Sequence, residues 1–281
     1  MKTLTDYLTN DVLKKKINQA QVKINSTAKL QSLATDLIHL LYDKNDQDGF
    51  LRMLGENREI ISRALGADAA DCFAAAVFDK HFDRLRDIYT RRNIPETILA
   101  ATMQDFNLWA DCYAAQHGRV GIGDTDWLIS HMTGELFQLG RLQFMMNETH
   151  DGAPALDIHI PASGKLDIDA CKRSMEWAVQ FAKSHFPERN YKALTLSCWL
   201  LGDEIKEILP PESNILQFAA LFTRTGEGGG THPVIYQFLF GFDKHKTDFA
   251  QHIAQTTLQK GAHRLLRENR WFTEQFGVIL I

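Results

Sequence analysis

The chain has 281 residues, 44% of them hydrophobic and 23% charged, as expected for a globular protein with one large or two modest domains. Its 31 basic and 35 acidic side chains give a net charge of −4, which predicts no general attraction to nucleic acid or to an anionic membrane. The four cysteines form no CxxC pair, no run of eighteen apolar residues occurs, and residues 1–10 lack the apolar run of a signal peptide. We therefore expect a cytoplasmic protein without a structural zinc site, a disulfide framework or a membrane span.

The first half of the chain is predicted to be mainly helical, because its apolar side chains recur at steps of three and four. The two clearest stripes are Leu13, Ile17 and Ile24, and then Leu30, Leu33, Leu37 and Leu41. Further helices are predicted to begin at Asp68, at Pro95 and at Asp124 or Thr125, the last running to Leu139. A short strand is predicted over residues 119–122.

The most informative stretch is predicted to be a strand, a tight loop, a helix and a second strand. Leu156, Ile158 and Ile160 alternate with polar residues, which indicates a half-buried strand. Residues 161–166 form the loop, residues 167–186 carry one apolar stripe on a helix, and residues 191–200 form the second strand. Two strands joined by a crossover helix are expected to be parallel, and the loop brings backbone N–H groups to a helix N-terminus where an anion can bind.

The other predicted elements gather around this stretch. Residues 141–147 are predicted to pair with the strand at 156–160 in a hairpin, and residues 203–209 are predicted to form a short helix. Further strands are predicted at 215–223, 234–240 and 276–281, with a turn at 226–232 and a helix from Asp248 to about Arg267. The predicted fold class is α+β: a mainly helical domain of residues 1–150 is followed by a mixed-sheet domain of residues 151–281, whose sheet begins at about residue 140.

Four segments of the sequence resemble the recurrent segments of bacterial acyltransferase-domain proteins. They are WLISHMTGELFQLGRLQF (127–144), IHIPASGKL (158–166), WLLGDEIKEILPPESNILQF (199–218) and TTLQKGAHRLL (256–266). These proteins carry an N-acyltransferase N-terminal domain followed by a GNAT-like C-terminal domain. The resemblance implies the acyl-CoA N-acyltransferase fold, in which two strands splay apart to admit the pantetheine arm and the next helix receives the pyrophosphate. It also implies acetyl-CoA or another acyl-CoA as donor, with no metal.

The resemblance also indicates which residues would bind the donor. They are Ile160, Ser163, Gly164, Lys165, Leu166 and Trp199. The usual phosphate-loop pattern of this fold is Gln/Arg-x-x-Gly-x-Gly/Ala, whereas residues 161–166 read PASGKL and keep one glycine. The charge of Lys165 can partly replace the lost N–H contacts. The short helix at 203–209 lacks the tyrosine that often protonates the leaving thiolate.

Acyl transfer to an amine needs a base, a polarised carbonyl and a proton for the thiolate, and four residues are candidates for this chemistry. They are His159, Ser197, Arg141 and Gln143. His159 is a candidate base, and a histidine satisfied by a strand neighbour is the alternative. Arg141 and Gln143 point into the cleft or form a structural network. Asp157 and Glu148 are alternative bases, Tyr236 is an alternative donor, and Cys198 is expected to be a core residue.

The sequence therefore predicts an acyl-CoA-dependent N-acyltransferase that acts by direct attack on the thioester. The acceptor would be a small-molecule or peptide amine, with no nucleic-acid or membrane partner. The alternative is a catalytically degenerate GNAT-like module that binds a ligand or a protein. The histidines match no known ligand spacing, so no metal site is predicted.

Overall fold

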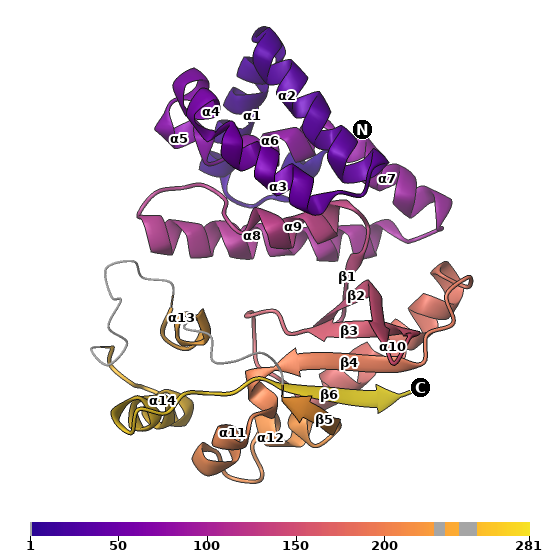
Figure 1. The fold of residues 1–281 in the computed structure, drawn as a ribbon, viewed down its shortest axis with the longest axis vertical. Coiled ribbons are helices and arrows are strands. Elements are labelled where there is room, and N and C mark those ends of the chain that lie inside the picture. Colours follow the sequence, from indigo (N-terminus) through magenta and orange to yellow (C-terminus); the bar gives the residue numbers. More distant parts are fainter. Residues whose placement is uncertain (1, 228–233, 242–251) are drawn as a thin grey trace. The chain divides into compact units, whose positions relative to one another are not determined.

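The computed structural model describes residues 2–227, 234–241 and 252–281 (Figure 1). The chain divides into two compact units, Met1–Phe137 and Gln138–Ile281. The first is helical and the second is built on a six-stranded mixed sheet, so the predicted order of a helical part followed by an α+β part is confirmed. None of the described helices is both long and apolar enough to cross a membrane.

The first unit packs its helices around the predicted apolar stripes. Leu13, Ile17 and Ile24 are fully buried, as are Leu30 and Leu37. The helices are α1 (Asp11–Ser26), α2 (Ala28–Ile38), α3 (Gln47–Glu56), α4 (Arg58–Leu65), α5 (Ala67–Ala70), α6 (Phe73–Lys80), α7 (Phe82–Arg91), α8 (Glu96–His117) and α9 (Thr125–Met132).

A buried polar network joins α8 to α9. The carboxylate of Asp105 accepts hydrogen bonds from the indole N–H groups of Trp109 (3.2 Å) and Trp127 (2.8 Å). Nε2 of His131, which is fully buried, lies 3.0 Å from the same carboxylate. A buried carboxylate needs such partners because its desolvation is otherwise costly.

Three local predictions for this half of the chain are wrong. The helix predicted from Asp68 is three helices, α5, α6 and α7, and residues 119–122 form a loop with no strand partner. The helix predicted to reach Leu139 ends at Met132, because Gly134 takes a left-handed conformation (φ 69°) that turns the chain into β1.

The second unit is a sheet in the order β1-β2-β3-β4-β6-β5. β3 and β4 are parallel and are joined by α10, while the pairs β2–β3, β4–β6 and β5–β6 are antiparallel. The strands are β1 (Leu136–Leu139), β2 (Leu142–His150), β3 (Ala153–His159), β4 (Ala193–Cys198), β5 (Thr223–Glu227) and β6 (Gln275–Leu280). The helices are α10 (Ile168–His185), α11 (Asp203–Ile208), α12 (Asn214–Ala219), α13 (Val234–Phe240) and α14 (Thr257–Arg267).

Two segments predicted as strands are helices in this unit. Residues 215–223 fall mainly in α12, whose first turn is capped by Ser213 Oγ, which accepts from the Leu216 N–H (3.2 Å). Residues 234–240 form α13, in which Ile235 and Leu239, four residues apart, pack on one hydrophobic cluster. The predicted helix start at Asp248 and most of the predicted turn at 226–232 lie outside the described residues, and α14 begins at Thr257.

A stability prediction follows from Gly140, which connects β1 to β2 in a left-handed conformation (φ 74°). A Cβ at this position would lie 2.6 Å from Ser174 Oγ, the atom that also accepts a hydrogen bond from the Arg141 N–H. We expect Gly140→Ala to lower the free energy of unfolding of this unit by about 2–4 kcal/mol, as backbone strain and overpacking add.

The matched control is Gly152→Ala in the β2–β3 turn, where φ is 76° and nothing lies within 4 Å of the added Cβ. That variant should lose only about 1 kcal/mol, the cost of the left-handed backbone. Equal losses in thermal or denaturant unfolding would show that the contact with Ser174 contributes nothing.

Candidate active site

Strands β3 and β4 lie side by side over only part of their length. Their parallel ladder ends at the pair Asp157–Thr195. Beyond it, β3 continues to His159 while still paired with β2, and β4 continues to Cys198 while still paired with β6. The backbone groups that face each other beyond the last pair therefore lack a ladder partner, and we call this unpaired stretch between the carboxyl ends of the two strands the slot.

The loop between β3 and α10, residues 161–166, is held from one side by Arg141. Its Nε donates to the carbonyl oxygen of Lys165 (2.8 Å), and its Nη2 donates to those of Pro161 (3.2 Å) and Gly164 (3.4 Å). In a trans peptide the C=O and the following N–H point in opposite directions. The N–H groups that follow these carbonyls, those of Ala162, Lys165 and Leu166, therefore face away from the guanidinium, and the three contacts hold the loop in one conformation.

The opposite side of this loop is open. Residues 162–165 are exposed, and Gly164 takes a left-handed conformation (φ 72°) with nothing within 4 Å of the position of a Cβ. Within the described chain, no hydrogen bond uses the N–H groups of Ser163, Gly164 or Lys165. Backbone N–H groups in such a turn, together with the exposed Lys165 side chain, suit a phosphate.

The N-terminus of α10 already carries negative charge. The Asp167 carboxylate caps the helix by accepting from the Ala170 N–H (2.8 Å), and Asp169 lies in the first turn. Both carboxylates stabilise the positive end of the helix, but they repel a second anion there. An anion at this site therefore depends more on the loop N–H groups and Lys165 than on the helix dipole.

A chain of polar contacts runs along one face of β3 and β4. His159 Nε2 lies 3.2 Å from Asp157 Oδ2, and the buried Thr195 donates from Oγ1 to Asp157 Oδ1 at 2.7 Å. The Asp157 carboxylate therefore lies within ion-pair distance of the imidazole of His159, whose side chain is 31% exposed.

Two further predicted residues share this face. Gln143 in β2 pairs in register with His159 and is 2% exposed, and its Nε2 has no hydrogen-bond partner among the described residues. A buried donor left unpaired costs roughly 1–3 kcal/mol, so the Gln143 amide lacks a partner that the described residues do not supply. Ser197, two residues after Thr195 in β4, is exposed beyond the end of the ladder.

Three of the predicted donor-binding residues form an apolar wall. Ile160, Leu166 and Trp199 are partly buried against one hydrophobic cluster. The cluster consists of Leu200, Ile205, Ile235, Ala262, Leu265 and Phe272. Ile160 precedes the loop at 161–166 and Leu166 ends it, so an apolar group beside the loop would meet this wall.

Cys198, predicted to be a core residue, is partly buried beside the same wall. It packs against the cluster, and its Sγ accepts from the Leu200 N–H at 3.4 Å. Burial raises the pKa of the thiol to about 12, so it stays protonated at neutral pH and is a poor nucleophile.

Sequence reasoning missed a bulge in β2. The register with β3 shifts between Met145 and Glu148, and the Met146 carbonyl accepts from Arg189 Nη1 (2.5 Å) and from the Tyr191 hydroxyl (2.8 Å). No sequence signal marks this bulge, because its partners lie more than forty residues further along the chain. Glu148 itself is exposed, and the side chain of Tyr236 lies outside the described residues.

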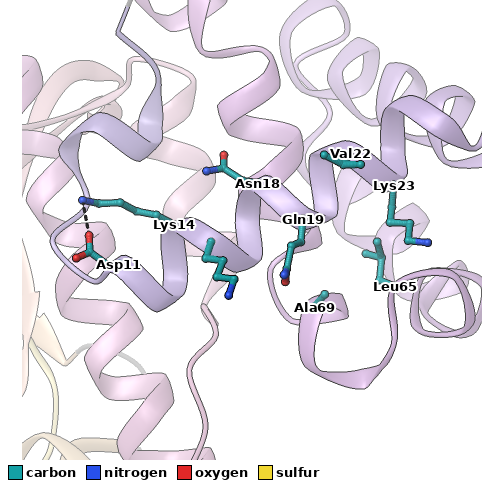
Figure 2. A pocket seen from close by; sticks show the side chains of 9 residues that line it. Asp11, Lys14, Asn18, Gln19, Val22, Lys23, Leu65 and Ala69 are labelled. Atoms are coloured by element: carbon teal, nitrogen blue, oxygen red, sulfur yellow. Dashed lines mark hydrogen bonds and ion pairs between the residues drawn. The ribbon is translucent and has the colours of Figure 1, made fainter.

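A separate groove of about 700 Å³ runs along α1 in the first unit and contains none of the predicted site residues. Figure 2 shows Gln19 and Lys23 extending from α1 towards Ala69 and Leu65, while Lys14 turns to Asp11. Across the described parts of the chain, no group of three or more His, Cys, Asp or Glu side chains is placed to hold a metal ion.

Comparison with solved structures finds acyltransferases of the same fold. One, an acyltransferase in complex with decanoyl-CoA, is 25% identical over 95% of this chain and 98% of that chain, with a TM-score of 0.70. A second, in complex with decanoyl-CoA and teicoplanin, is 23% identical over 98% and 85%, with a TM-score of 0.76. A third, in complex with CoA and 10C-teicoplanin, is 24% identical over 84% and 79%, with a TM-score of 0.71.

Family models match both units in the order that the resemblance implied. Residues 10–134 match the N-acyltransferase N-terminal domain, and residues 136–279 match the GNAT-like C-terminal domain. Comparison with curated proteins gives no match. Since the two models together span nearly the whole chain, it belongs to the family of two-domain proteins in which an N-acyltransferase N-terminal domain precedes a GNAT-like C-terminal domain.

Proposed function

We propose that this chain is an N-acyltransferase that takes an acyl group from acyl-CoA and transfers it to an amine by direct attack on the thioester. The observation that carries the proposal is the early end of the β3–β4 ladder at Asp157–Thr195, just before a loop with unpaired N–H groups. Crystallised acyltransferases of the same fold contain CoA or decanoyl-CoA. The donor proposed here is therefore acetyl-CoA or a longer acyl-CoA.

The residues around the slot fit the parts of such a donor. The pyrophosphate would accept hydrogen bonds from the N–H groups of residues 163–165, with the Lys165 ammonium adding a positive charge. The pantetheine arm would lie in the slot beside the apolar wall of Ile160, Leu166 and Trp199. Arg141 keeps the loop in shape through three carbonyl contacts and would touch no phosphate.

The thioester carbonyl needs donors that meet the negative charge as it forms on oxygen. Two are available in this arrangement: a backbone N–H of β3 beyond Asp157, where the ladder with β4 has ended, and Nε2 of Gln143. Both belong to strands, so little reorganisation is required when the charge develops.

Proton transfer would begin at His159. The imidazole, oriented by Asp157, takes the proton from the amine nitrogen as the C–N bond forms. When the C–S bond breaks, the thiolate takes up one proton, delivered through the exposed hydroxyl of Ser197. One proton thus leaves nitrogen and one arrives on sulfur, and no covalent acyl-enzyme is formed.

The acceptor is proposed to be an amine on a small molecule or a peptide. Acyltransferases of this fold have been crystallised with teicoplanin and 10C-teicoplanin. A cytoplasmic location is part of the proposal, since none of the four cysteines, all of which are described, forms a disulfide.

A second candidate function, donor binding without turnover, is favoured by one observation. Two carboxylates, Asp167 and Asp169, occupy the helix end that receives pyrophosphate in this fold, and the loop keeps one glycine. Thermal unfolding with acyl-CoA and thiol release with a library of amines separate the two functions. A rise in melting temperature with thiol release supports the enzyme, a rise without release supports the binding module, and no rise at millimolar donor rejects both.

The first variant tests the loop. We expect Gly164→Asp to abolish the rise in melting temperature with CoA, because a carboxylate would stand where phosphate oxygens are proposed to bind. Without the substitution, CoA at a hundred times its dissociation constant should add about 2.7 kcal/mol of stability. Gly152→Asp is the matched control, since Gly152 also has φ near 75° and open space but lies in the β2–β3 turn. An undiminished CoA response in Gly164→Asp would move the anion site elsewhere.

The second variant tests the charge at the start of α10. Asp167→Asn keeps a side chain that caps the helix and removes one negative charge, so CoA should bind about two- to fivefold more tightly at low salt. Calorimetric titration measures this, and 0.5 M salt should erase most of the gain. Asp167→Ala serves as the comparison, because it also loses the cap and about 1 kcal/mol of stability. Weaker CoA binding by Asp167→Asn would show that phosphate does not approach this end.

The third variant tests the base. His159→Gln should lower kcat by about 10²–10⁴-fold while the CoA-induced rise in melting temperature is kept. Asp157→Asn should lower kcat less, because the imidazole stays but loses its orienting carboxylate. Full activity of His159→Gln would assign the histidine to the sheet framework alone.

A further inference from the structure

The first unit contains a half-open pocket that the proposed acyl transfer does not use. It has a volume of about 390 Å³, within the roughly 300–1,000 Å³ typical of small-ligand sites. Its walls come from α3, α4, α5, α6 and the loop after α8, all within this unit. The apolar lining consists of Leu51, Leu54, Ile61, Ala67, Ala70, Ala74 and Ile122.

The charged side chains that line the pocket are two arginines and one aspartate, so their charges do not cancel. Arg119 lies 2.6 Å from Asp71 through Nη2, and the same nitrogen donates to the Tyr113 hydroxyl at 3.4 Å. That arginine and that carboxylate therefore neutralise each other. Arg58 also lines the pocket, and among the described residues it forms no ion pair or hydrogen bond through its side chain. The pocket keeps one net positive charge, at Arg58.

A hydroxyl stands beside this charge. Ser62 lies four residues after Arg58 on α4, so the two side chains share one face of the helix. Ser62 also lines the pocket, and its hydroxyl has no hydrogen-bond partner in the described chain. A guanidinium with a neighbouring hydroxyl matches a carboxylate, which accepts two parallel N–H bonds from arginine and one more from O–H.

We propose that this pocket binds a monocarboxylate with an apolar body, its carboxylate on Arg58 and Ser62 and its hydrocarbon on the apolar lining. A cationic ligand is disfavoured because Asp71 is already paired with Arg119 and Arg58 repels it. A polyanion is disfavoured because the Asp71 carboxylate lies in the same lining. The proposal goes beyond the acyl transfer and does not depend on it.

The test is calorimetric titration of the full chain with sodium octanoate. Octanoate is expected to bind at one site, and hexanoate about tenfold more weakly, since each buried methylene contributes about fourfold. Octan-1-ol, which lacks the carboxylate, should bind at least tenfold more weakly than octanoate.

Two variants on the same helix locate the site. Arg58→Gln should weaken octanoate binding about tenfold, because the positive charge is lost. Arg58→Lys should weaken it less, because the charge stays and only the pair of parallel N–H donors of the guanidinium is lost. Arg63→Gln is the control, since Arg63 pairs with Glu59 on the surface and does not line the pocket. Arg58 is exposed, so its replacement should leave the melting temperature unchanged.

The same titration with saturating CoA separates this site from the slot between β3 and β4. Unchanged octanoate affinity supports the pocket in the first unit, whether or not the chain proves to be an acyltransferase. Absence of octanoate binding, equal affinity in Arg58→Gln, or loss of binding when CoA is present would each overturn the proposal.

Discussion

The end of the β3–β4 ladder at Asp157 and Thr195 is the constraint on which the rest of the candidate site depends. Parallel strands joined by a helix normally continue to pair, and unpaired backbone groups are costly unless another partner takes them. Here β2 pairs with β3, and β6 with β4, to the ends of these strands, so the ladder between β3 and β4 ends early without loss of the sheet. His159 ends β3 and Trp199 directly follows β4, so both lie beyond the last pair of this ladder.

The loop after β3 shows how a phosphate-type turn is kept in shape with a single glycine. Arg141 donates to three carbonyl oxygens of the turn, so the N–H groups that follow them, including that of Lys165, face the other side. A guanidinium donates several hydrogen bonds from one rigid plane, so a single arginine can hold several carbonyl groups of a turn in place. A second glycine would give the same turn more conformational freedom. The cap of α10 by Asp167 stabilises the helix and opposes an anion at the same time. The positive charge of Lys165 opposes this repulsion and favours an anion at the loop.

Much of the fold was predictable from periodicity. The stripes in α1, α2 and α10, the β2–β3 hairpin and the strand–helix–strand unit follow from local patterns of two or 3.6 residues. The two errors in the second unit are of one kind: α12 and α13 carry short apolar runs that fit both periods. The helical state of α12 depends on the cap at Ser213, and that of α13 depends on the hydrophobic cluster in which Ile235 is buried. Neither feature can be recognised from the few residues of the apolar run itself. The sequence interpretation put the domain boundary at about residue 150 with the sheet beginning at about 140, whereas the units divide between Phe137 and Gln138.

The candidate site divides in the same way. The sequence alone determined the loop, the helix that follows it, the family, and the alternation that puts His159 and Asp157 on one face of a strand, because these are properties of neighbouring residues. Only the tertiary structure decided that the ladder stops at Thr195, that Arg141 binds the loop, and that Gln143 is left buried with an unpaired amide. Each of these depends on residues sixteen or more positions apart that meet only after folding, and their register is determined by the packing of the whole sheet.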